Sequence, residues 1–184
     1  MPRPRESGGS GSSTMALTPE RAASEDAAKD AALRILASGP RTVREVEDRL
    51  LSRGFDASAA ERAIERLRRV SLLDDRAFVR SFLRTELLRA PQGMRLLVAK
   101  LRRRGVPPAL VQEIDSLLQE DTDLVERSLS SETERGRAAF HQLRRGRAGL
   151  PPDVYRRRIT QALARRGFEW DVIRDLLGEE TEGT

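Results

Sequence analysis

The sequence predicts an all-α protein built from three tandem three-helix repeats in an elongated, curved arrangement. Leu, Ala, Arg and Glu, which are strong helix formers, dominate the 184 residues, and only 4% are aromatic. Apolar residues recur at the spacing of helix faces. A short phrase also occurs three times, with Leu four before a Gly, Arg directly before it and an apolar residue directly after. Such internal repeats are typical of proteins with extended binding surfaces. The three copies occupy residues 50–55, 101–106 and 163–168.

Five segments follow from composition and from the three phrases. Residues 1–24 are expected to be a disordered tail, because their Gly-, Ser- and Pro-rich start has little apolar surface to bury. The three repeats are expected at residues 25–73, 74–120 and 121–178. Residues 179–184 are expected to form a frayed C-terminus.

The first repeat carries clear helix boundaries. Its first helix ends before a Gly-Pro pair. Its second helix begins at an N-cap, Thr42, where Glu45 completes a capping box. It ends at Gly54, because the left-handed backbone conformation that often terminates a helix favours Gly. Its third helix follows an N-cap at Asp56 or Ser58.

The second repeat opens at Asp74 and Asp75. Two adjacent carboxylates could serve acid/base or Mg²⁺ chemistry, but their place at a helix start favours capping. This first helix is expected to stop near Pro91. The second helix runs from about Gln92 to Gly105, and a Pro pair opens the third.

The third repeat is longer and less regular. Its first helix is expected within 122–147, where Gly136, Gly146 and Gly149 could break or end it. The second helix opens at Pro151-Pro152 and ends at Gly167. The last helix carries Trp170, the only tryptophan, which we interpret as a packing residue, with an anchor for a partner as the alternative.

Charge is distributed unevenly along the chain, which has a net charge of +5 and 34 basic residues. Residues 76–106 contain nine basic residues and one acidic residue, and residues 135–166 contain ten and one. Between them, residues 113–134 contain eight acidic residues and one basic residue, while the first repeat is nearly balanced. The basic blocks predict electropositive surfaces for phosphate or for an acidic protein partner.

Several chemistries are excluded or disfavoured. The absence of cysteine excludes disulfides, thiolate nucleophiles and Cys-based zinc sites. His141, the only histidine, has no ordered partners for a metal site, and no phosphate loop or nucleophile elbow occurs. We therefore expect a protein that is not an enzyme and needs no cofactor or metal. With no signal-peptide core and no membrane-length apolar run, we expect no membrane association and a cytoplasmic location.

Ten arginines are the candidate partner- and DNA-binding residues. The planar guanidinium of Arg bonds bidentately to phosphate and to carboxylate. The alternative interpretation of each run is a solvated face with internal ion pairs. The candidates are Arg80, Arg84, Arg102, Arg103, Arg104, Arg156, Arg157, Arg158, Arg165 and Arg166.

The order and spacing of four phrases resemble the RecX family of bacterial RecA regulators. The phrases are Leu50-Leu51-Ser52-Arg53-Gly54-Phe55, Ser71-Leu72-Leu73-Asp74-Asp75-Arg76-Ala77-Phe78, Lys100-Leu101-Arg102-Arg103-Arg104-Gly105-Val106 and Arg165-Arg166-Gly167-Phe168. The resemblance implies three tandem three-helix repeats. It also implies a regulator that binds the RecA recombinase filament on DNA and lowers its ATP hydrolysis, strand exchange and coprotease activity.

That resemblance places the chain in homologous recombination, DNA repair and the SOS response, with single-stranded or filament-bound DNA and RecA as partners. We expect a monomer. Two alternatives stay open from the residues alone. One is a helix-turn-helix-like DNA-binding protein that acts without a recombinase. The other is a helical scaffold that binds only proteins.

Overall fold

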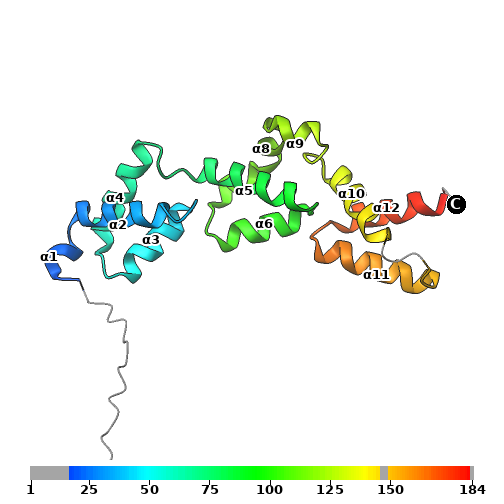
Figure 1. Ribbon diagram of the computed structural model, residues 1–184, viewed down its shortest axis with the longest axis horizontal. Coiled ribbons are helices and arrows are strands. Elements are labelled where there is room, and N and C mark those ends of the chain that lie inside the picture. Colours follow the sequence, from blue (N-terminus) through cyan, green and yellow to red (C-terminus); the bar gives the residue numbers. More distant parts are fainter. Residues whose placement is uncertain (1–16, 146–148, 183–184) are drawn as a thin grey trace, which may run out of the picture.

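The computed structural model describes residues 17–145 and 149–182, and within these ranges the regular structure is entirely helical. Figure 1 shows the helices as three groups that follow one another along the long axis of the molecule. The predicted all-α fold of three three-helix repeats is thereby confirmed. Residues 1–16 of the expected tail lie outside the described residues.

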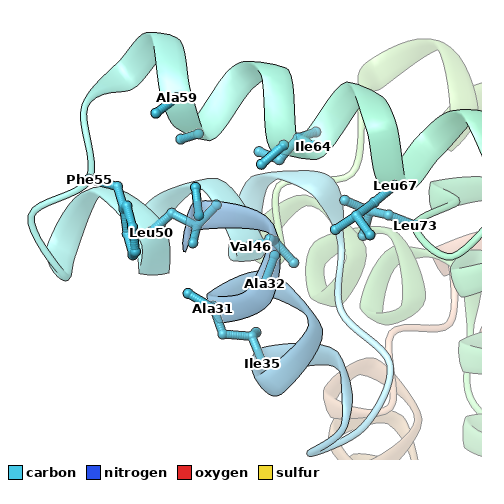
Figure 2. Packing of buried hydrophobic residues seen from close by; sticks show 13 residues of the cluster. Ala31, Ala32, Ile35, Val46, Leu50, Phe55, Ala59, Ile64, Leu67 and Leu73 are labelled. Carbon is cyan, nitrogen blue, oxygen red and sulfur yellow. The ribbon is translucent and has the colours of Figure 1, made fainter. Parts of the chain in front are cut away.

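The first repeat consists of α2 (Glu25–Leu36), α3 (Val43–Ser52) and α4 (Ala57–Arg69). The capping box that the sequence predicts is present at the start of α3. Thr42 Oγ1 accepts from the N–H of Glu45 at 3.1 Å, and the Glu45 carboxylate accepts from the N–H of Thr42 at 3.2 Å. Apolar side chains of all three helices point toward a common centre (Figure 2).

The second repeat consists of α5 (Asp75–Arg89), α6 (Met94–Arg103), α7 (Pro108–Gln112) and α8 (Ile114–Glu120). The Asp74 carboxylate accepts from the N–H groups of Arg76 and Ala77 at 2.8 and 3.2 Å, so it is the N-cap that the sequence predicts. The expected third helix is interrupted at Glu113, which separates α7 from α8.

The third repeat consists of α10 (Glu132–Arg145), α11 (Pro152–Arg165) and α12 (Trp170–Glu182). Of the three glycines that could break or end this helix, Gly136 does neither, Gly149 lies beyond the helix, and Gly146 lies outside the described residues. Gly136 lies buried inside α10, where a Cβ would stand 2.9 Å from Val172 Cγ1, so close packing requires glycine there. The break comes earlier, after the short helix α9 (Thr122–Glu126), where Ser128 has a φ of +56°.

Each repeat has its own apolar core, and α9 belongs to the second one. Leu124 is buried in the cluster of α5 to α8, and Leu129 packs against that cluster. The sequence assigned both residues to the third repeat. Small separate cores explain how a chain with few aromatic residues folds without one large core.

The two ends are more ordered than the sequence suggests. Within the expected tail, residues 19–22 form α1 (Pro19–Ala22), and Leu17 packs against the first core. The Ala22 carbonyl accepts from the N–H of Asp56 at 2.9 Å. At the other end, the expected frayed segment continues α12, and Glu179 pairs with Arg137 at 2.9 Å.

The three copies of the repeated phrase form the same turn after α3, α6 and α11. Gly54, Gly105 and Gly167 have φ values of +87°, +75° and +82°, in the left-handed region that favours glycine. In each copy the glycine N–H reaches the carbonyl three residues earlier, and the next N–H reaches the carbonyl five residues earlier. These two bonds satisfy helix-end carbonyls as in a Schellman motif.

Candidate partner-binding surface

The second helices of the three repeats form a head-to-tail row. At the first junction Thr42 Oγ1, at the start of α3, donates to the Arg104 carbonyl at 2.6 Å. At the second junction the N–H of Gly93, at the start of α6, donates to the Arg166 carbonyl at 2.9 Å. The C-terminal turn of one second helix therefore docks on the N-terminus of the preceding one. In Figure 1 α3, α6 and α11 lie along the same edge of the molecule.

Close backbone approach makes these junctions depend on glycine. A Cβ on Gly105 would lie 2.6 Å from Arg44 Cβ, and one on Gly167 would lie 2.4 Å from Leu96 Cβ and from its backbone nitrogen. A Cβ on Gly93 would lie 2.2 Å from the Gly167 carbonyl oxygen. The repeated Arg-Gly turns of repeats 2 and 3 are thus docking elements between repeats.

Charged groups reinforce the first junction. The Arg104 guanidinium binds both carboxylate oxygens of Glu45 at 2.8 and 3.0 Å and lies 4.5 Å from the centre of the Phe78 ring. Burial works to raise the pKa of Glu45, but the hydrogen bonds from Arg104 and Thr42 outweigh it and leave that pKa lowered. Arg104, a predicted binding residue, therefore has a structural partner.

Asp75, the other member of the predicted capping pair, also ties repeat 2 to repeat 1. Its carboxylate accepts from the N–H of Val43 at 2.8 Å. Burial raises the pKa of Asp75, and the hydrogen bond from Val43 and the charge of Arg68 do not fully offset it. In the sequence, this residue was indistinguishable from an ordinary helix cap.

The second junction is held by Arg135, which is completely buried. Its Nε donates to the Gln92 carbonyl at 2.9 Å, and its Nη1 donates to the Leu129 and Ser130 carbonyls at 2.8 Å each. These bonds join α10 to the start of α6 and to the segment after α9. Sequence reasoning missed this residue, because it reads as one more arginine of a basic block.

The arginines of α5 are paired with the acidic stretch. Arg84 pairs with Asp121 at 3.5 Å and also with Asp123. Arg80 pairs with Glu120, and this hydrogen bond lowers the pKa of Glu120. The predicted residues Arg80 and Arg84 thus already have carboxylate partners from α8 and the start of α9. The neighbouring Arg76 shares this arrangement and binds Glu113 and Glu120.

Six of the ten predicted arginines are exposed and form no ion pair with any other residue in the described ranges. All six lie on the second helices α6 and α11. They are Arg102, Arg103, Arg156, Arg157, Arg158 and Arg165. We call this set the basic row. The remaining candidate, Arg166, is half-buried, and its Nη1 lies 3.3 Å from Gln142 Oε1.

The basic row does not extend onto α3. There Arg44 pairs with Glu47 at 3.5 Å and with Asp48 at 3.1 Å. The six exposed candidate arginines therefore all lie on repeats 2 and 3. An exposed surface of this kind can bind phosphate or carboxylate groups.

Trp170 corrects a sequence prediction, because its residue surface is 60% exposed and is not packed in the last repeat. It stands at the first position of α12, and the preceding Glu169 pairs with Arg95 at 3.9 Å. The apolar face of α12 is supplied by other residues, chiefly Ile173, Leu176 and Leu177.

Two surface hollows of the described chain are lined in part by ion-paired side chains. One of them, of about 950 Å³, lies on the first repeat, where Glu25 pairs with Arg62 and Arg66 at 3.5 and 3.6 Å. Within residues 17–145 and 149–182, no three metal-ligating side chains come together. None of the helices described there is long and apolar enough to cross a membrane.

These features define a class: an all-helical repeat protein with exposed arginines on the second helices of its second and third repeats. The models of the first, second and third three-helix domains of RecX match residues 28–67, 74–114 and 132–177. The regulatory protein RecX of Chlorobaculum tepidum is 32% identical over 163 residues, covering 85% of this chain and 92% of that protein. RecX of Mycolicibacterium smegmatis is 33% identical over 159 residues, covering 85% and 80%.

The chain therefore belongs to the RecX family of regulatory proteins. A crystal structure of RecX from Lactobacillus salivarius superimposes with a TM-score of 0.69 at 23% identity, covering 84% of this chain and 95% of that one. A second RecX crystal structure gives a TM-score of 0.66 at 21% identity. Both similarities confirm the fold.

Proposed function

We propose that this chain binds RecA recombinase filaments on DNA and lowers their ATP hydrolysis, strand exchange and coprotease activity. The observation that carries the proposal is the basic row, six exposed arginines on α6 and α11 that lack ion-pair partners within the described ranges. Family membership supports a regulatory role. A regulator of this kind acts by occupying a surface, so its binding residues need charge and reach rather than a catalytic pocket.

The head-to-tail row suggests how binding lowers activity. The contacts between the second helices join repeats 2 and 3, which supports a partner that spans arginines of both helices. If the basic row contacts two neighbouring recombinase subunits, or DNA and one subunit together, it restricts the subunit movements that ATP hydrolysis and strand exchange require. Several weak contacts on one rigid body also combine into tight binding through a high effective concentration.

The proposal is tested by adding the purified protein to RecA-coated single-stranded DNA and following ATP hydrolysis. We expect hydrolysis to fall as the protein approaches stoichiometry with recombinase. Unchanged hydrolysis, with filament binding also absent, would remove RecA as the partner. The proposed activity corresponds to a role in homologous recombination, DNA repair and the SOS response, in the cytoplasm and as a monomer.

Binding to DNA alone separates this proposal from the main alternative. A DNA-binding protein that acts without a recombinase should bind free DNA tightly at physiological salt, with an affinity that falls steeply as salt rises. The filament regulator should bind RecA-coated DNA more tightly than free DNA of the same length. A scaffold for proteins alone should show no affinity for DNA.

A further inference from the structure

The turn after α3 is the one copy of the repeated turn in the described chain that has no repeat to dock on. The Arg104 and Arg166 carbonyls each accept a hydrogen bond from the start of a preceding second helix. The Arg53 carbonyl, at the equivalent position, accepts none from the described residues. A Cβ on Gly54 would meet nothing within 4 Å, whereas the equivalent atoms on Gly105 and Gly167 would clash.

Two side chains beside this open turn are exposed and available for contact with a partner. Leu51, three residues before the glycine, is 41% exposed, while the equivalent positions hold Arg102 and Ala164. Arg53 is exposed and has no ion pair with another described residue. We infer that the turn 50–55 is an interaction surface for the N-terminus of a helix in the protein partner. The inference rests on the proposed function, in which that partner is the recombinase.

The two internal junctions define the chemistry of the occupant. In both, a carbonyl at the negative end of one helix meets hydrogen-bond donors at the positive end of another. At the first junction the arginine side chain also binds Glu45, an acidic residue in the first turn of the docked helix. The occupant is therefore a helix start with a free N-cap donor, and an acidic first turn would pair with Arg53.

Nucleic acid fits this turn poorly. The open group is a carbonyl oxygen at a helix C-terminus, and both its partial charge and the helix dipole disfavour phosphate. A second copy of this chain also fits poorly. Among the described residues, α11 is the second helix whose start receives no turn from another repeat, and there Pro151 and Pro152 have no N–H to donate in the way that Gly93 does.

The test measures binding of variants to RecA filaments assembled on single-stranded DNA. Gly54→Asn adds a side chain at the open turn, and Asn tolerates the left-handed region. Its control is Gly149→Asn, because Gly149 has a similar φ of +95° and equally open surroundings. We expect Gly54→Asn to bind about tenfold more weakly, because the added side chain keeps the partner helix from the Arg53 carbonyl and one hydrogen bond is lost. Gly149→Asn should bind like the unaltered protein.

A second variant, Leu51→Gln, keeps the backbone unchanged and should also weaken binding. The absence of cysteine in the chain permits direct mapping of the occupant. Ser52→Cys, labelled with a photoreactive group, should cross-link to a recombinase peptide that contains the first turn of a helix. Cross-links that fall only within helices or loops would overturn the inference.

The outcomes separate the two claims. If the unaltered protein binds filaments and Gly54→Asn and Leu51→Gln bind equally well, this inference fails while the proposed function stands. If the unaltered protein does not bind filaments, both fail. If sedimentation shows self-association that Gly54→Asn abolishes, the occupant is a second copy of the chain and the recombinase assignment is wrong.

Discussion

Replacing the glycine in each of the three equivalent turns with alanine measures how strongly the repeats depend on docking. Every replacement places a Cβ in the left-handed region, at a cost of about 1–2 kcal/mol. At Gly54 this is the whole cost, because nothing lies within 4 Å. At Gly167 the new Cβ would also stand 2.4 Å from Leu96 Cβ and from its backbone nitrogen. Overpacking of this kind costs about 1–3 kcal/mol more.

We therefore expect a total loss of about 2–5 kcal/mol for Gly167→Ala and about 1–2 kcal/mol for Gly54→Ala. Gly105→Ala should also lose more than Gly54→Ala, because its Cβ would stand 2.6 Å from Arg44 Cβ, an atom that moves only with the backbone. The free energy of unfolding is measured by urea titration, followed by far-ultraviolet circular dichroism. If all three variants lose the same free energy of unfolding, the claim that Gly105 and Gly167 are needed for docking between repeats is refuted.

Three further predictions concern the junctions and the exposed tryptophan. Arg135→Met should lower the free energy of unfolding by about 2 kcal/mol in the same urea titration, because one buried and two partly buried carbonyls lose their donor; a loss below about 0.5 kcal/mol would contradict the role of Arg135 in holding the second junction. The pKa of Glu45 is lowered in the folded protein, so its stabilising contribution is present above the unfolded pKa and disappears as pH falls through the folded one. Glu45→Gln should therefore lower Tm at neutral pH, with a deficit that shrinks in acid; a deficit independent of pH would contradict the ionic role. Trp170→Ala should change stability by less than about 0.5 kcal/mol, and the intrinsic fluorescence should show a solvent-exposed indole; a large loss would mean that Trp170 is packed.

Local signals explain why the helices and turns could be predicted from the sequence. The Thr42–Glu45 capping box, the Asp74 cap and the left-handed glycines each depend on residues within a few positions of one another. The placement of Leu124 in the second core could not be predicted in the same way. It depends on whether a short apolar segment packs against the preceding helices or the following ones, and its own spacing is the same in both cases.

The sequence shows which arginines are candidates for binding, but it does not show which of them are exposed and which are already paired. In the sequence, the arginines of α6 and α11 cannot be told from Arg80 and Arg84 of α5, because the acidic partners of α5 are distant in the chain. The burial of Arg135 and the exposure of Trp170 also depend on contacts between segments distant in the sequence. Residue type favours burial of tryptophan and exposure of arginine, and here tertiary packing reverses both.

The central claim is that the basic row, rather than basic charge in general, binds the filament. Its most direct measurement compares two triple variants that remove equal charge. One replaces Arg156, Arg157 and Arg158 of α11 with Gln, and the other replaces the paired Arg76, Arg80 and Arg84 of α5. Circular dichroism should show that both retain their helices.

Affinity for RecA filaments on single-stranded DNA is then measured at several salt concentrations. We expect the α11 variant to bind at least about tenfold more weakly and to depend less on salt, because unpaired charges that contact the partner are lost. The α5 variant should bind within about threefold of the unaltered protein, since surface arginines already held in ion pairs contribute little. Equal losses for the two variants, or a greater loss for the α5 variant, would contradict the account.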